Sequence, residues 1–334
     1  MPRVTMKDVA REAGVSMMTV SRAFKMNSSV GDTTRARIME AAHRLGYVFD
    51  TTASNLRARR TDFLAVVVPS INNANFADTV AGLSEEAEDL GLQPLLAYTN
   101  YDMAREEAAI VDLLRRRPMA ITLTGGNHTP HARTMLEGAG IPVIETWDLP
   151  PDPLGHVVGF SNAACMETLV EHLVTRGRER IAFIGGDSSS DTRGADRRRG
   201  FARAMEQRGL DAGRLIAAGV PPISMREGAE AMERLLRSRP DTEAVICVSD
   251  VAAFGALSEC QRRGIAVPDD MAIAGFGAYE ISEVCLPRLT TIDASSLRIG
   301  REAGQILKRI AAGEIEDGPV RVEIEPNLVV GGTT

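Results

Sequence analysis

Residues 4–22 read VTMKDVAREAGVSMMTVSR, and this stretch decides the fold of the first part of the chain. Ala10 is small enough for a second helix to cross the first closely, and Gly14 suits the positive φ of a tight turn between the two helices. Val20 falls where the second helix must face an apolar core. This spacing predicts a helix-turn-helix, whose second helix can present its outer face to the major groove of double-stranded DNA.

A third helix is expected at 32–45, where apolar residues recur at helical spacing and Gly46 follows as a left-handed terminating residue. Charge is distributed unevenly between this three-helix head and the body that follows it. Residues 1–60 carry a net charge of +6, whereas the remainder carries −13. A basic head on an acidic body indicates a head that meets a polyanion, although a solvated charged face would give the same count.

The outer face of the second helix carries the candidate base contacts. Arg22 can donate two hydrogen bonds to guanine, and Met17 and Met18 can contact thymine methyl groups. The alternative is that both methionines pack into the core, but Val20 and Phe24 already supply apolar side chains on that side. The residues of the head that we expect to contact bases or phosphates are Thr5, Ser16, Met17, Met18, Thr19, Ser21, Arg22 and Asn27.

The stretch 4–22, together with 35–47, resembles the N-terminal signature of the LacI family of transcriptional regulators. In that family the next segment is a hinge helix that folds on DNA and wedges a leucine into the minor groove. The resemblance therefore adds Ala53 and Leu56 to the expected DNA-binding residues. One departure from the family pattern falls here, because this chain has Phe49-Asp50 where the family usually has Pro-Asn.

From Phe63 onward, short apolar runs alternate with amphipathic helical segments. Alternating β and α units predict parallel sheets covered by helices on both faces. Because this order runs twice, we expect an α/β sensor domain with two Rossmann-like lobes. The expected domains are a helix-turn-helix DNA-binding domain at 1–49, a hinge helix and linker at 50–61, and an effector-binding domain at 62–334, with an N-lobe of about 62–160 and 293–321 and a C-lobe of about 161–290 and 322–331.

Residues that follow the ends of the expected strands are the candidates for ligand binding, because such sheets bind ligands at the carboxyl ends of their strands. His128 could instead cap a turn, and Arg197 could be a surface residue of a basic helix start. Trp147, the only tryptophan, is expected in the core rather than on a sugar-stacking platform. The candidate effector-binding residues are Ser70, Asn73, Phe76, Thr124, His128, Glu145, Phe160, Arg197, Ser249 and Asp250.

The body resembles periplasmic sugar-binding proteins, and head and body together resemble the LacI family over essentially the whole chain. Segments 140–145 and 267–276 are similar to the gluconate-operon repressor branch of that family. In the family, the position of Arg197 carries an effector-binding arginine, which can hold a carboxylate by two hydrogen bonds. Gly277 stands where many sugar-binding members have an aspartate, so the ligand need not bind as a neutral sugar would. The resemblance implies a sugar acid, with gluconate as the first candidate.

Together these features predict a cytoplasmic repressor of carbohydrate or sugar-acid metabolism that binds a palindromic DNA operator as a homodimer. Binding of the effector is expected to change the spacing of the two hinges and to release the protein from DNA. Two other classes stay open at this point. One is a solute-binding protein, which would share the body, and the other is an enzyme that acts on a sugar acid.

Motifs that would favour an enzyme or a metal site are absent from the sequence. The chain has no G-x-S-x-G, H-E-x-x-H or P-loop pattern. His128 and His131 are three residues apart, but no acid or cysteine is spaced to complete a metal site. The four cysteines are distant from one another and are expected to be buried and reduced. We therefore expect no catalytic residue, metal ion, cofactor or membrane partner.

Overall fold

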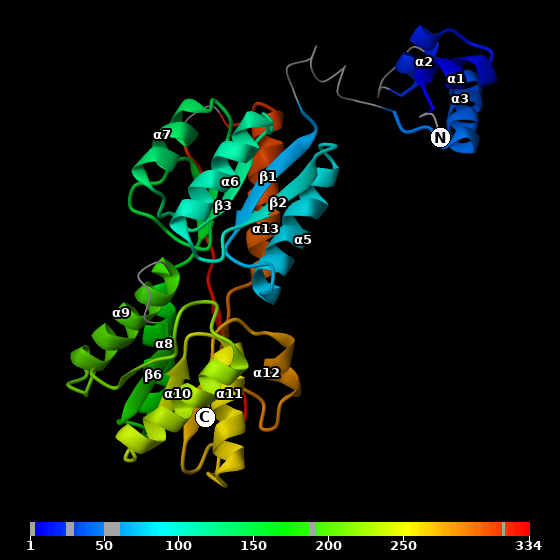
Figure 1. The fold of residues 1–334 in the computed structure, drawn as a ribbon. Helices are drawn as coiled ribbons and strands as arrows, with labels where there is room; N and C mark the ends of the chain where they lie inside the picture. The colour runs from blue at the N-terminus through cyan, green and yellow to red at the C-terminus, as the bar shows by residue number, and fades with distance from the viewer. Residues whose placement is uncertain (1–3, 25–29, 50–60, 187–190, 316–317) are drawn as a thin grey trace. The chain divides into compact units, whose positions relative to one another are not determined.

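The structure, a computed structural model, describes residues 4–24, 30–49, 61–186, 191–315 and 318–334. Residues 1–60 and 61–334 form two separate compact units, each with its own apolar core (Figure 1). Within the described part of the chain, no helix combines the length and the apolar character needed to span a membrane.

Three helices form the first unit: α1 (Met6–Glu12), α2 (Met17–Ala23) and α3 (Asp32–Leu45). The backbone N–H and the hydroxyl of Thr5 donate to the Asp8 carboxylate at 3.0 and 2.6 Å, which fixes the start of α1. Gly14 has a φ of 62° in the turn between α1 and α2. The predicted helix-turn-helix is therefore confirmed. Its core consists of Val9, Ala10, Ala13, Val20, Ala23, Ile38, Ala41 and Ala42.

The second unit has two lobes, and the N-lobe is built on a six-stranded parallel sheet. In spatial order the strands are β11 (Arg321–Glu323), β5 (His156–Gly159), β4 (Val143–Thr146), β3 (Ile121–Thr124), β1 (Phe63–Val68) and β2 (Gln93–Tyr98). The helices that cover it are α5 (Ala74–Glu88), α6 (Met103–Arg115), α7 (Pro130–Gly138) and α13 (Ser296–Ala311). Alternation along β1 directs Leu64 and Val66 into the core with α5 and α13, and Ala65 and Val67 into the core with α6 and α7.

Close packing of α5 against α13 requires glycine on both helices. A β-carbon on Gly82 would lie 2.2 Å from the carbonyl oxygen of Leu297, and one on Gly300 would lie 2.0 Å from that of Thr79. Such distances are below van der Waals contact, so any side chain at either position would force the two helices apart.

The C-lobe is built on a four-stranded parallel sheet. In spatial order the strands are β7 (Leu215–Ala217), β6 (Ile181–Gly185), β8 (Ala244–Cys247) and β9 (Ala272–Ala274). Its helices are α8 (Asn162–Thr175), α9 (Thr192–Gln207), α10 (Met225–Ser238), α11 (Asp250–Arg262) and α12 (Glu280–Val284). A separate antiparallel pair is formed by β10 (Thr291–Asp293) and β12 (Asn327–Val329). Three segments connect the lobes, as β5 leads into α8, β10 into α13 and β11 into β12.

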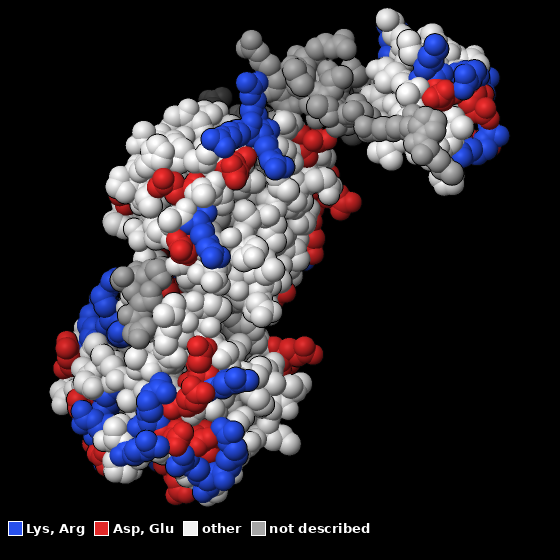
Figure 2. Space-filling model, in the orientation of Figure 1, with Lys and Arg blue, Asp and Glu red and all other residues white. Residues whose placement is uncertain are grey.

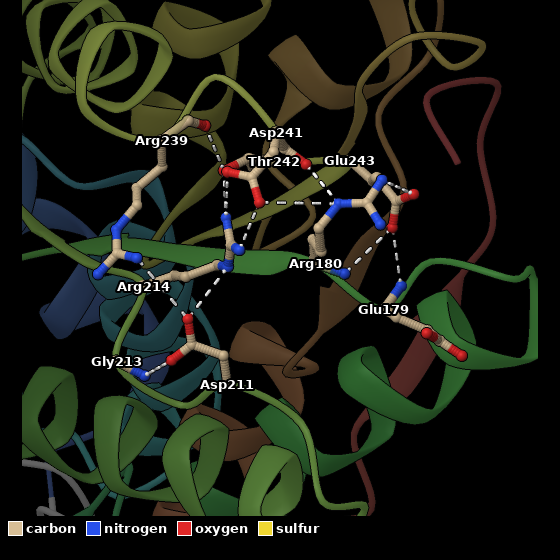
Figure 3. Close-up of polar contacts among 9 residues, drawn as sticks. All are labelled: Glu179, Arg180, Asp211, Gly213, Arg214, Arg239, Asp241, Thr242 and Glu243. Carbon is tan, nitrogen blue, oxygen red and sulfur yellow. Dashed lines mark hydrogen bonds and ion pairs between the residues drawn. The ribbon is translucent and has the colours of Figure 1, made fainter.

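Basic and acidic side chains are interspersed over the C-lobe surface (Figure 2), and some of them form an ordered network. Figure 3 shows this network at the amino ends of β6, β7 and β8. Arg214 donates from both terminal nitrogens to the Asp241 carboxylate, at 3.0 and 2.7 Å. Arg180 forms an ion pair with Glu243 and donates from Nε to the Asp241 carbonyl at 2.6 Å. These bonds join the amino ends of the three strands β6, β7 and β8 to one another.

Candidate nucleic-acid interface and ligand cavity

Helix α2 presents long side chains on a face that the first unit leaves uncovered. Met17 and Met18 are 53% and 66% exposed, and Arg22 is exposed on the same helix. Val20 and Ala23, on the opposite side of α2, are fully buried. The methionines therefore do not belong to the core, which excludes the alternative that the sequence left open for them.

Several small polar residues of the first unit face solvent and also form hydrogen bonds at the starts of its helices. Ser16 caps α2, with its Oγ accepting from the Thr19 backbone N–H at 3.1 Å. Thr5 is exposed and engaged with Asp8, and Ser21 is half-buried. Arg22 makes no ion pair with any described residue, so its guanidinium is available to a partner. The three other predicted DNA contacts, Asn27, Ala53 and Leu56, lie outside the described residues.

A cavity of about 730 Å³ is lined by residues of both lobes in the second unit. This volume is in the range of small-molecule sites. The N-lobe contributes three asparagines from the start of α5, together with Phe76, Tyr101 and Trp147. The C-lobe contributes charged and aromatic residues, which include Asp191, Arg193, Arg197, Arg226, Phe276 and Tyr279. The cavity is therefore lined by amide, hydroxyl, aromatic and cationic groups, and by the carboxylates of Asp191 and Glu227.

Two buried arginines on α9 dominate the electrostatics of the cavity. Arg197 donates from Nε to Asn162 Oδ1 at 3.0 Å and from Nη1 to the Val248 carbonyl at 2.9 Å. Its guanidinium carbon lies 3.6 Å from the centre of the Phe276 ring. Burial lowers the pKa of Arg197. Arg193 is also buried, and its Nη1 donates to the Thr124 carbonyl at 3.1 Å.

Neither of these guanidinium groups has a carboxylate within 4.0 Å among the residues that the structure describes. Asp191 lines the cavity nearby, but its Oδ1 accepts from the Gly194 backbone N–H at 3.1 Å and caps α9. A buried positive charge that is paired only with neutral acceptors is costly. The cavity is therefore suited to an anionic ligand.

Aromatic and amide groups shape the N-lobe wall. Trp147 packs edge-to-face against Phe76 and Phe160, with ring centres 5.4 and 5.7 Å apart, and its Nε1 donates to Thr79 Oγ1 at 3.0 Å. Trp147 is buried as expected, yet it also borders the cavity. Its φ of 71° is unusual for a non-glycine residue, and such strain concentrates at functional sites.

Four of the ten candidate effector-binding residues line the cavity: Asn73, Phe76, Arg197 and Ser249. Ser70 and Thr124 are buried and engaged with backbone groups, Ser70 Oγ accepting from Asn72 N at 3.1 Å and Thr124 Oγ1 donating to the Val67 carbonyl at 3.2 Å. Their side chains stabilise strand ends instead of facing the cavity.

Phe160 and Asp250 support the cavity from behind. Phe160 is fully buried between Trp147 and Phe276, so it is a packing residue. Asp250 is fully buried, and burial raises its pKa to about 6. Its carboxylate accepts from Thr291 Oγ1 at 2.6 Å and from the Tyr279 backbone N–H at 2.9 Å. Asp250 therefore positions the loop that carries Tyr279 rather than lining the cavity itself.

His128 and Glu145 belong to a buried cluster within the N-lobe and are not among the residues that line the cavity. His128 Nδ1 lies 2.6 Å from Glu106 Oε1, and His128 Nε2 lies 3.4 Å from Glu145 Oε1. Burial alone would lower the pKa of His128, but the two carboxylates outweigh it and raise this pKa to about 9. The ring thereby forms a charged link between α6, β4 and the loop before α7.

Most of the residues that line the cavity were not predicted as effector contacts, and Tyr101, Arg193 and Tyr279 are among them. Arg193 precedes Arg197 by four residues, which places both on one face of a helix, so this spacing was a usable signal. Tyr101 has a φ of 59° and lies in a loop, and no sequence pattern predicts its direction. Tyr279 follows Gly277 and Ala278, which have φ of 124° and 50°, and its place depends on that turn.

The fold and these two sites define a regulator that joins a helix-turn-helix to a two-lobed ligand-binding domain. Residues 5–50 match the family model described as "Bacterial regulatory proteins, lacI family", and residues 170–334 match that of the periplasmic binding protein-like domain. The chain belongs to the lacI family and is a DNA-binding transcriptional regulator. This confirms the family resemblance that the sequence suggested.

Comparison with individual proteins gives the same assignment. The chain is 36% identical to the HTH-type transcriptional regulator GntR of Pseudomonas aeruginosa, over 97% of this chain and 94% of that protein. A lacI-family transcriptional regulator from Silicibacter pomeroyi has a similar structure, with a TM-score of 0.91, 33% identity and 99% of each chain covered. A complex of the transcriptional regulator CelR with cellobiose has a TM-score of 0.72 and 27% identity, with 99% of this chain and 100% of that chain covered.

Proposed function

We propose that this regulator is a repressor whose affinity for operator DNA is controlled by a sugar acid bound between the two lobes, with gluconate as the first candidate. The observation that carries this proposal is the pair of buried guanidinium groups, Arg193 and Arg197, that line the cavity without a carboxylate partner within 4.0 Å among the described residues. A ligand carboxylate would supply the missing negative charge and could accept two parallel hydrogen bonds from an arginine.

The remaining groups of the cavity suit the polyhydroxyl part of such a ligand. Asn72, Asn73 and Asn75 offer amide donors and acceptors from the N-lobe, and Ser249 offers a hydroxyl from the C-lobe. The similar regulator CelR, solved with cellobiose, supports carbohydrate binding in this type of domain. A sugar acid combines both requirements, because it carries one carboxylate and several hydroxyl groups.

The DNA-binding side of the proposal rests on α2. A single short helix contacts too few base pairs for tight specific binding, so we propose that a homodimer reads two inverted half-sites. A ligand then acts only through its different affinity for the DNA-competent and DNA-incompetent arrangements. The chain acts by this binding equilibrium and not as an enzyme, in agreement with the regulators that it resembles.

Ligand titration of the full chain tests the cavity assignment. Trp147 is the only tryptophan and borders the cavity, so its fluorescence reports occupancy directly. Gluconate is titrated beside glucitol, which has the same number of carbons and no carboxylate. We expect saturable binding of gluconate and at least a tenfold weaker response to glucitol, since a charge-assisted hydrogen bond contributes about 1.5–3 kcal/mol. Equal affinities for the two compounds would refute an anionic effector.

A further inference from the structure

We propose that Arg193, and not only Arg197, determines specificity for an anionic effector, and that it links the ligand's charge to both lobes. This inference rests on the proposed function and assigns a specific residue to the recognition of the carboxylate. Arg193 belongs to α9 of the C-lobe, whereas the carbonyl that accepts its 3.1 Å hydrogen bond belongs to Thr124 at the end of β3 in the N-lobe.

The two arginines differ in how much of their hydrogen-bonding capacity the protein already uses. Arg197 donates to Asn162 and Val248, and one face of its guanidinium is covered by Phe276. Arg193 donates only to Thr124 among the described residues, although a guanidinium has five N–H groups. Arg193 therefore has the larger unused donor capacity toward a ligand.

Arg193 also lies where two cavities meet. It lines the large cavity and a second, smaller one of about 20 Å³, which Tyr101 also lines. Each side-chain nitrogen of Arg193 either donates a hydrogen bond or retains solvent-accessible surface. Its free N–H groups are therefore accessible from the cavities, as an anion would require.

The surroundings leave room for this guanidinium and place no carboxylate of a described residue within 4.0 Å of it. A β-carbon on Gly125 would lie 2.6 Å from Arg193 Nη1, so the absence of a side chain there makes the space that the group occupies. The Phe76 ring lies on another side, with its centre 5.9 Å from the guanidinium carbon. An anion that binds Arg193 therefore contacts a group already bonded to the opposite lobe, so ligand charge and lobe arrangement are coupled through one side chain.

The test uses the full chain with Arg193→Gln, which removes the charge and keeps a donor for the Thr124 carbonyl, and Arg193→Lys, which keeps the charge. Arg199→Met is the matched control, because Arg199 lies on the same helix, pairs with Asp196 and has a side chain that is 75% exposed. Trp147 fluorescence measures affinity for gluconate and glucitol, and circular dichroism confirms folding.

We expect Arg193→Gln to weaken gluconate binding about 10- to 100-fold and to leave glucitol binding within about twofold, so that discrimination between the two is largely lost. Arg193→Lys should recover part of the gluconate affinity, and Arg199→Met should bind like the unaltered protein. Unchanged gluconate affinity in folded Arg193→Gln, or an equal loss for both ligands, would overturn the inference alone. Failure of the unaltered protein to prefer gluconate to glucitol would overturn the proposed function as well.

Discussion

The phenol of Tyr279, in the C-lobe, donates a 2.9 Å hydrogen bond to Oδ1 of Asn73, the residue that caps α5 in the N-lobe. Both residues border the ligand cavity. Two other hydrogen bonds join the lobes beside this cavity, from Arg193 to the Thr124 carbonyl and from Asn162 Nδ2 to the Trp147 carbonyl at 3.0 Å. A ligand that alters the relation between the lobes must keep or replace these links.

Removal of the Tyr279 hydroxyl should therefore slightly lower the stability of the effector domain and change its affinity for the effector. Tyr279→Phe is expected to lower the free energy of unfolding by about 1 kcal/mol, because one neutral hydrogen bond is lost. It should also change the effector affinity measured by Trp147 fluorescence. Tyr98→Phe is the control, since Tyr98 is an exposed residue of β2. If neither unfolding by urea nor effector affinity differed from the control, the link would have no energetic role.

Base recognition by α2 can be separated from general affinity for DNA. Arg22→Ala should cost about 1–3 kcal/mol with the preferred sequence and much less with unrelated DNA. Arg37→Ala, which removes an exposed arginine of α3, serves as the comparison. Fluorescence anisotropy measures the affinity for an operator selected from a random DNA library and the affinity for a scrambled duplex. An equal loss on both duplexes would contradict base readout by Arg22.

The buried His128 cluster predicts a loss of stability at alkaline pH. Burial would lower the pKa of His128, but the hydrogen bond to Glu106 and the nearby charge of Glu145 outweigh it and raise this pKa from 6.5 to about 9, so the imidazolium stabilises the folded state. This contribution is complete below pH 6.5 and is lost as the pH rises through 9. Thermal unfolding between pH 6 and 9.5 should show a falling midpoint.

His128→Gln should lower the free energy of unfolding by about 3–5 kcal/mol at pH 7, because it leaves buried carboxylates without their cation. In this variant the midpoint of thermal unfolding should also fall less steeply between pH 6 and 9.5. His131→Gln, at an exposed position of α7, should retain the decline. A decline of equal slope in His128→Gln would show that the pH dependence arises elsewhere.

The ion-pair network of the C-lobe predicts a loss of stability at acidic pH. The hydrogen bonds from Arg214 lower the pKa of Asp241 from 3.8 to about 2. Asp241 therefore stabilises the folded state above pH 3.8, and this contribution is lost as the pH falls toward 2. Asp241→Asn should unfold at a higher pH than the unaltered protein when followed by circular dichroism. Asp112→Asn, which removes an exposed pair with Arg115, should not shift the acid transition.

The first unit could be predicted closely because its signals are local. A small residue, a turn glycine and an apolar residue at fixed spacing specify α1 and α2, and Gly46 ends α3 with the expected positive φ. The parallel sheets were predictable from apolar runs, except for the exposed three-residue strand β7. The three-residue strands β10 and β12 were not, because they are too short to carry a periodic pattern and form by pairing with each other.

The cavity could be predicted only in part, because the end of a strand fixes where a residue lies and not where its side chain points. His128 follows β3 as expected, but two carboxylates from α6 and β4 hold its ring inside the N-lobe. Tyr101 reaches the cavity from a left-handed backbone conformation that depends on tertiary contacts. The direction of these side chains is set by partners that are distant in the sequence.

The central claim is that occupancy of the cavity controls the affinity of the α2 surface for DNA. It is tested most directly by anisotropy titration of the full chain with its selected operator, in the absence of ligand and with gluconate at a concentration that saturates the Trp147 signal. We predict at least a tenfold loss of operator affinity with gluconate, and none with glucitol at the same concentration. Unchanged operator affinity at proven saturation would contradict the account.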